Sequence, residues 1–193
     1  MNFVDYTEYV GRALGSVDTA EVEKLIESIF EAYRSGATVF VIGNGGSAAN
    51  ASHFAQDLAK GTCSSMDQER RIRALSLTDN IAFFSALGND EGYDQVFVQQ
   101  LRTFYRPGDL LVSISGSGNS PNVLRAVEFA NASGMKTIGI TGFSGGKLKD
   151  MVHEQVHVPL DDMCTAESIH SIVFHYVILE LQKRMVEERA KAG

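Results

Sequence analysis

The chain has 193 residues, of which 44% are hydrophobic, so it can bury a core of its own and lies in the size range of a single domain. Its net charge of −7 argues against nucleic-acid binding, no apolar run reaches the roughly 18 residues of a membrane span, and the N-terminus lacks the basic start of a signal peptide. Two cysteines are too few for a disulfide framework and suit a reducing compartment, so we expect a cytoplasmic protein without nucleic-acid or membrane partners.

Helical patterns open the chain over about residues 5–13 and 19–33, the second with apolar residues along one face. Asp18 and Thr19 are the candidate N-caps for the second helix, and Gly36 is a candidate C-terminal stop. Strands are expected at 38–42, 72–77, 110–115, 136–140 and 155–158. Helical patterns fall between these strands at 48–59, 81–86, 93–104 and 122–132, and a long helix is expected over 166–190.

This alternation predicts an α/β fold, a doubly wound five-stranded parallel sheet flanked by helices, with N-terminal helices and a long C-terminal helix. One domain over 1–193 is expected, divided into N-terminal helices (1–36), an α/β core (37–160) and a C-terminal helix (161–193). The loop Gly61–Glu69 is the one obvious flexible insertion. A ligand is expected beyond the carboxyl ends of the strands.

Two strands break abruptly into loops rich in glycine and serine. The apolar run of Thr38–Ile42 leads into Gly43–Ser47, and that of Leu110–Ser115 leads into Gly116–Ser120. A helical pattern follows each loop, so that backbone N–H groups, hydroxyls and a helix N-terminus can all face an anion. The pair predicts a site for a small phosphorylated ligand, although ordinary βα turns also contain these residues. The first loop lacks both the P-loop ending and the full dinucleotide-binding spacing.

A second candidate site joins two helices. His53 and Asp57 are four residues apart on a predicted helix and therefore share a face, while Glu167 and His175 lie on the long C-terminal helix. Imidazole and carboxylate at this spacing form a half-site for a divalent transition metal, which a second helix can complete. The alternatives are a helix-surface His–Asp pair and a core histidine at position 175; His170 is a spare imidazole.

At these residues the chain resembles the phosphoheptose isomerases (sedoheptulose 7-phosphate isomerases) of the SIS domain superfamily, whose fold is flavodoxin-like. The resemblance extends from the N-terminal helices to about Met185. It rests on five motifs in order: Gly43-Asn44-Gly45-Gly46-Ser47, His53-Phe54-Ala55-x-Asp57, Gly88-Asn89-Asp90, Ser115-Gly116-Ser117-Gly118-Asn119-Ser120 and Thr141-Gly142-x-x-Gly145-Gly146.

The resemblance implies a role for each matching position. Asn44 and Asp90 match positions that face sugar hydroxyls, although a turn role for Asp90 is the alternative. His53, Asp57, Glu167 and His175 match zinc and catalytic positions. Asp57 is the implied base and His175 its acid/base partner, and whether Asp57 serves as ligand, base or both is open. The substrate-binding positions are Asn44, Gly45, Gly46, Ser47, Asp90, Ser115, Gly116, Ser117, Ser120 and Glu167.

Four positions depart from the family pattern. Asp57 stands where the family usually has Glu, and Glu167 stands where it usually has Gln, so the expected metal set carries two carboxylates instead of one. Cys164 replaces a usual Asp and removes a polar substrate contact. Gly116 replaces a frequent Thr and removes one hydroxyl. Two carboxylates would bind zinc tightly but weaken it as a Lewis acid, and the oxygen donors also admit other divalent transition metals.

The resemblance implies an aldose–ketose isomerase that converts sedoheptulose 7-phosphate to D-glycero-D-manno-heptose 7-phosphate for heptose biosynthesis. The family's homotetramers, with active sites at subunit contacts, imply a homo-oligomer here. Two alternatives remain open: a non-catalytic SIS module that binds a sugar phosphate or a partner, and an isomerase of a different phosphosugar. The ionisable groups at all four positions of the histidine–carboxylate set favour an enzyme.

Overall fold

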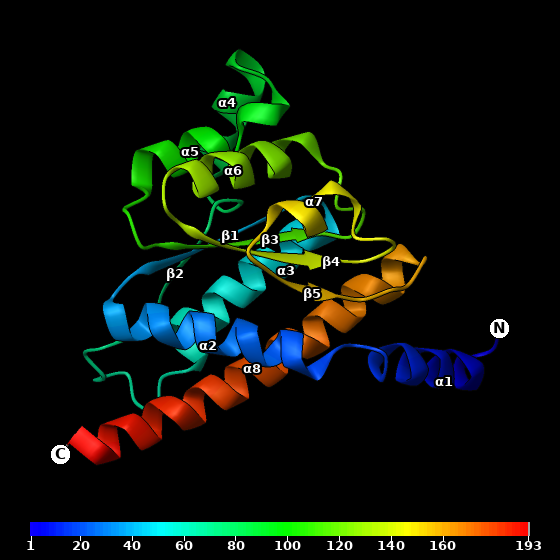
Figure 1. Cartoon of the computed structure of the whole chain (residues 1–193), viewed down its shortest axis with the longest axis horizontal. Coiled ribbons are helices and arrows are strands. Elements are labelled where there is room, and N and C mark those ends of the chain that lie inside the picture. The colour runs from blue at the N-terminus through cyan, green and yellow to red at the C-terminus, as the bar shows by residue number, and fades with distance from the viewer. Residues whose placement is uncertain (193) are drawn as a thin grey trace.

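The computed structural model describes residues 1–192; Gly193, the last residue of the expected C-terminal segment, lies outside the described residues. Figure 1 shows a central sheet with a layer of helices on each face. The elements in chain order are α1 (Phe3–Leu14), α2 (Thr19–Ser35), β1 (Thr38–Gly43), α3 (Gly46–Gln56), η1 (Asp57–Gly61), β2 (Arg73–Ser76), α4 (Ile81–Asp90), η2 (Tyr93–Gln95), α5 (Val98–Phe104), β3 (Leu110–Ser115), α6 (Pro121–Ala132), β4 (Lys136–Thr141), α7 (Gly146–Met151), β5 (Glu154–His157) and α8 (Met163–Ala192).

The sheet has five parallel strands in the order β2-β1-β3-β4-β5, which confirms the doubly wound α/β prediction. Each strand lies within one residue of its expected bounds. The central strand β3 is buried along its whole length, because helices cover both faces of the sheet. One apolar core lies between the sheet and α2, α3 and α8, and a second lies between the sheet and α5, α6 and α7.

Several helical segments differ from the sequence expectation; α4 continues to Asp90 instead of ending at 86, and α8 begins at Met163 instead of 166. The expected helix over 48–59 begins earlier, at Gly46, and ends in a π-helical turn over Asp57–Gly61. The expected helix over 93–104 is a 3₁₀ turn followed by α5. The helix α7 was not predicted, because its six residues are too few to show an apolar period.

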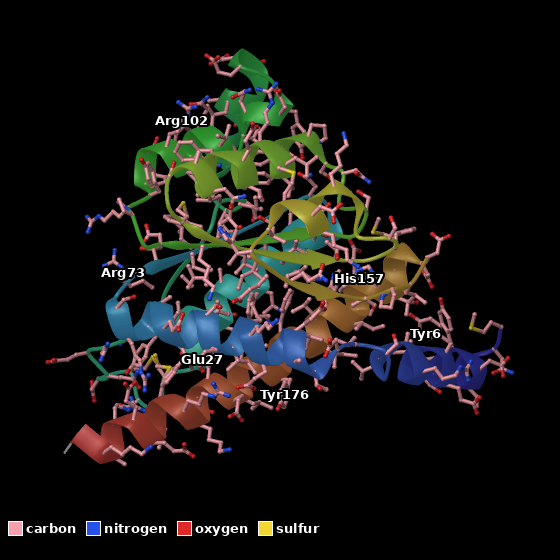
Figure 2. All side chains as sticks on the ribbon, in the orientation of Figure 1. Tyr6, Glu27, Arg73, Arg102, His157 and Tyr176 are labelled. Atoms are coloured by element: carbon pink, nitrogen blue, oxygen red, sulfur yellow. The ribbon has the colours of Figure 1, made fainter. Side chains whose placement is uncertain are left out.

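The first and last helices extend beyond the sheet. Figure 1 shows α1 projecting from the body and α8 running obliquely beneath it to the C-terminus. Only Ala13 of α1 is buried, and Phe3 and Val4 are largely exposed. Figure 2 shows Tyr6 on α1 and Tyr176 on α8, where Tyr176 is 55% exposed. Within residues 1–192, no helix is long and apolar enough to cross a membrane.

Candidate active site

The two glycine–serine loops meet at one edge of the sheet. Strands β1 and β3 are paired in parallel, so the loops that follow them leave the sheet side by side. Together with the start of α8 they enclose a cavity of about 240 Å³. This cavity, called the loop cavity below, is lined by Asn44, Gly45, Gly46, Ser47, Ile114, Ser115, Gly116, Ser117, Ser120, Met163 and Glu167.

The loop cavity offers hydrogen-bond donors without a side-chain cation. Among the described residues that line it, none is lysine or arginine. Ser47 lies in the first turn of α3, whose N-terminus therefore faces the cavity. In the second loop, the Ser115 hydroxyl accepts a hydrogen bond from the Gly118 N–H at 3.2 Å. Hydroxyls and N–H groups at a helix N-terminus suit an anion, as the two sequence patterns predict.

Asn44 is held in place by two residues that the sequence analysis did not identify. The side chains of Asn44 and Asn122 exchange two hydrogen bonds, each 2.9 Å long. The Tyr93 hydroxyl donates to the Asn44 side-chain oxygen, also at 2.9 Å. Asn122 lies two residues after the serine loop, in the first turn of α6, and this position is a signal that could have found it. Tyr93 reaches the site only through the fold.

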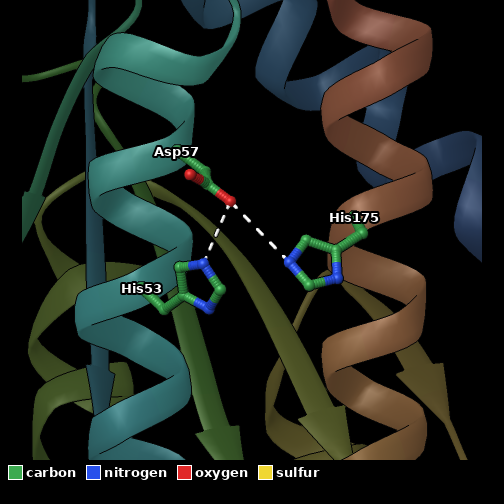
Figure 3. A group of neighbouring side chains, drawn as sticks. All are labelled: His53, Asp57 and His175. Carbon is green, nitrogen blue, oxygen red and sulfur yellow. Dashed lines mark ion pairs between the residues drawn. The ribbon is translucent and has the colours of Figure 1, made fainter.

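Two histidines and an aspartate meet between α3 and α8 (Figure 3). The Nε2 atom of His53 lies 3.3 Å from Oδ2 of Asp57, and that of His175 lies 3.9 Å from the same oxygen. One ligand atom from each of the three residues lies within 4.8 Å of the other two. Both histidine side chains are about half exposed, at 52% and 55%, so a ligand can reach them. These three residues are called the histidine group below.

The histidine group fits a tetrahedral metal site by its donor set and spacing. Bonds of about 2.0–2.2 Å to zinc place neighbouring ligand atoms about 3.3–3.6 Å apart. The two distances from Asp57 Oδ2, 3.3 and 3.9 Å, lie close to that range. Three protein ligands with an open fourth position are typical of catalytic zinc. The structure thus offers residues able to hold a divalent ion.

Glu167 and Asp90 lie outside the histidine group. Glu167 precedes His175 by eight residues, about 12 Å along the helix axis, and lines the loop cavity. The resemblance implies that Glu167 is a fourth metal ligand, and this role stays a prediction, because the structure places Glu167 in the cavity lining and not in the histidine group. Asp90 ends the exposed helix α4 and accepts a hydrogen bond from Asn89. Figure 1 shows α4 at the outer edge of the molecule, and Asp90 is not among the residues that line the loop cavity.

The spare imidazole, His170, is fully buried in the core beneath these sites. Its Nε2–H donates to the Thr141 carbonyl oxygen at 3.1 Å, and its Nδ1 atom has no partner among the described residues. Burial lowers the pKa of His170 to about 4, so the ring is neutral at physiological pH. His170 is therefore a core histidine and is not accessible to a ligand.

The fold and the loop cavity define a class of protein, the SIS domain, whose sequence profile matches residues 3–142. Relatives include the phosphoheptose isomerase of Geotalea daltonii, 34% identical over 181 residues (93% of this chain and 92% of the relative). The phosphoheptose isomerase of Aliarcobacter butzleri is 35% identical over 179 residues, with coverage of 93% and 92%. The chain belongs to the phosphoheptose isomerase family.

Solved structures agree with this assignment. Phosphoheptose isomerase GmhA from Neisseria gonorrhoeae superimposes with a TM-score of 0.85 at 30% identity, and covers 93% of this chain and 96% of its own. The phosphoheptose isomerase from Francisella tularensis gives a TM-score of 0.86 at 28% identity, with coverage of 95% and 100%. The resemblance stated from the sequence motifs is confirmed, as is the SIS fold.

Proposed function

We propose that this protein is an aldose–ketose isomerase that converts sedoheptulose 7-phosphate to D-glycero-D-manno-heptose 7-phosphate, a step of heptose biosynthesis. One observation carries the proposal: α3 links the loop cavity to the histidine group. Ser47 lines the cavity, and His53 follows it by six residues, about 9 Å along the helix axis. A phosphate bound at the loops therefore leaves the far carbons of an extended sugar beside the histidine group.

The reaction needs groups that move a proton between adjacent carbons. Aldose–ketose isomerisation passes through an enediol, so a base takes a proton from one carbon and an acid returns it to the neighbouring carbon. Asp57 is proposed as the base and His175 as its acid/base partner, supported by their meeting beside His53 in a solvent-accessible group. Ser47, Ser115, Ser117 and Ser120 bind the phosphate, and Asn44 binds sugar hydroxyls.

We further propose that His53, Asp57 and His175 hold zinc or another divalent transition metal. When bound, such an ion supplies Lewis-acid stabilisation of the negative charge that develops on substrate oxygens. Two imidazoles with one carboxylate suit zinc, and the oxygen donor also admits manganese or iron. Metal analysis of the purified protein tests this part, and a protein that binds no divalent ion would contradict it.

Purified protein incubated with sedoheptulose 7-phosphate, with and without zinc, tests the isomerase activity directly. We expect aldose product, and more of it with metal. Shorter ketose phosphates in parallel reactions test the alternative of a different phosphosugar. The second alternative, a non-catalytic binder, predicts sugar-phosphate binding without product. The histidine group favours the enzyme, because phosphate binding alone does not require it.

Assembly into a homotetramer is also proposed, in the cytoplasm, where both free cysteines stay reduced. Phe3 and Val4 on α1, and Ile172 and Leu179 on α8, expose apolar side chains that a second copy can cover. Asp90, which is not among the residues that line the loop cavity, would then serve a site across a subunit contact. Light scattering that shows a 21.0 kDa monomer at micromolar concentration would contradict this assembly.

A further inference from the structure

The first turn of α8 rests on a glycine in each of the two loops. A Cβ atom built on Gly116 would overlap the sulfur of Met163 and lie 3.1 Å from its Cε. A Cβ atom on Gly46 would lie 2.6 Å from Oε1 of Glu167. Met163 and Glu167 are four residues apart and share a face of α8. Any side chain in place of Gly116 or Gly46 would therefore clash with Met163 or Glu167 unless these side chains moved.

Of the two α8 residues that line the loop cavity, Met163 lies farther from the histidine group along the helix. It precedes His175 by twelve residues, about 18 Å along α8, whereas Glu167 lies between them. Met163 lines the cavity and is nevertheless 39% exposed, so its side chain is a wall of the cavity more than a part of the core. The thioether occupies the space above Gly116 that a side chain at that position would otherwise fill.

We propose that Met163 is a specificity-determining residue, which limits how far a phosphate enters between the two loops and so selects the length of the sugar. This inference rests on the proposed function of the same site. Helix α3 carries Gly46 and Ser47 of the loop cavity and His53 of the histidine group, so the distance between these residues changes little. A stop at the phosphate end therefore decides how many carbons of the sugar extend from the loop cavity toward the histidine group.

Removing the thioether deepens the cavity and should favour longer substrates. For Met163→Ala, we expect the preference for an octulose 8-phosphate over sedoheptulose 7-phosphate to rise by about tenfold or more, since one methylene in a fitted pocket discriminates by about 10–200-fold. The preference is measured both as a ratio of kcat/KM values and as a ratio of dissociation constants by titration calorimetry. Met163→Leu, of similar volume, is the matched control and should stay within about twofold of wild type.

The contact with Gly116 allows a double-mutant cycle. In the Met163→Ala background, Gly116→Ala places a methyl group in the vacated space and should return the length preference toward the wild-type value. In the wild-type background the same change displaces the thioether and should weaken binding of both sugars. If the thioether and a side chain at position 116 share one space, Gly116→Ala restores the length preference in the Met163→Ala background and weakens sugar binding in the wild-type background.

A folded Met163→Ala protein with the wild-type preference in both measurements would overturn the inference; circular dichroism checks the fold. If Met163→Ala does not fold, Met163→Val shortens the side chain and decides the same question. If the wild type binds ketose phosphates without turnover, the isomerase proposal fails, and the dissociation-constant ratios still decide the role of Met163. If the wild type binds no ketose phosphate, both the proposed phosphate site and the proposed role of Met163 are wrong.

Discussion

The loop cavity and the histidine group both use residues of α3 and α8 but are built in different ways. The cavity is formed mainly by backbone and small side chains at the ends of buried strands. The histidine group consists of three side chains from two helices, and its imidazoles are half exposed. In the proposed site, many weak donors would share the binding of the phosphate, whereas a metal site would depend on each member of the histidine group. Single substitutions should therefore weaken binding only partly in the loop cavity, whereas single substitutions in the histidine group should nearly abolish activity.

Support from neighbouring segments shows the same contrast. The serine loop is held by the loop after β4 and by α7. The Gly142 N–H of that loop donates to the Gly116 carbonyl at 2.9 Å, and the Leu148 N–H of α7 donates to the Gly118 carbonyl at 2.9 Å. The Asn119 side chain donates to the Ser117 carbonyl at 2.9 Å. The histidine group is joined by its own contacts and by the edge-to-face packing of His53 on His175. The cavity is thus preorganised by backbone.

The largest effect is expected in the histidine group. His175→Ala removes a proposed acid/base group and a proposed metal ligand together, and should lower kcat by about 10²–10⁴-fold. Steady-state assays and metal analysis measure the two losses. His153→Ala, at an exposed histidine outside the group, is the control and should keep activity. Normal turnover of the His175→Ala protein would show that the group is structural.

The next effect concerns the core beneath both sites. Burial holds His170 neutral, with its pKa lowered from 6.5 to about 4. The unfolded chain binds a proton in this range and the folded chain does not, so stability falls as pH falls from 6.5 toward 4. The shift corresponds to about 3 kcal/mol at most. Burial also lowers the pKa of His157, which adds a loss in the same direction.

Urea unfolding between pH 7 and pH 4 checks this prediction. His170→Leu should unfold with a shallower dependence on pH, because the variant has no group at this position to titrate. The variant also loses the hydrogen bond to Thr141, so its stability at pH 7 can fall as well. The difference in slope, and not the stability at one pH, is the test. Parallel pH profiles for both proteins would contradict it.

A smaller, graded effect is expected in the loop cavity. Ser47→Ala and Ser117→Ala should each weaken sugar-phosphate binding by about 1.5–3 kcal/mol, the contribution of one hydrogen bond to a charged group. Backbone N–H groups and the other hydroxyls remain, so binding should persist. Titration calorimetry measures the change, with the exposed Ser85→Ala on α4 as control. Unchanged affinity in both loop variants would remove the cavity as the phosphate site.

Glu167→Gln should have the smallest effect. The carboxylate lines the loop cavity, where it would repel the phosphate of the proposed substrate, and removing one charge at about 4 Å is worth about 1 kcal/mol in a well-solvated site. We expect several-fold tighter binding of the sugar phosphate and unchanged metal content. Loss of metal from this variant would instead identify Glu167 as the fourth ligand and would move it from the cavity to the histidine group.

Much of the fold follows from local sequence patterns. Strands β1 and β3 were predictable because each is an apolar run of strand length that ends in a glycine–serine loop, at Gly43–Ser47 and Gly116–Ser120. The pairing of His53 with Asp57 was predictable because helical periodicity places residues four apart on one face. Each of these two patterns, the strand followed by a loop and the helical spacing, is contained in about ten consecutive residues. The short helix α7 and the π-helical turn at Asp57–Gly61 carry no such local signal.

The contacts of α8 depended on the tertiary structure. His175 reaches Asp57, and Met163 reaches Gly116, across long separations in sequence, because the sheet and its apolar core place α8 beside α3. The same packing turns His170 into the core and leaves Glu167 in the loop cavity, although all these residues share one helix. The sequence shows which residues can do chemistry. The burial of α8 against the sheet determines which of them meet, because each residue's direction around the helix is fixed by the face that packs.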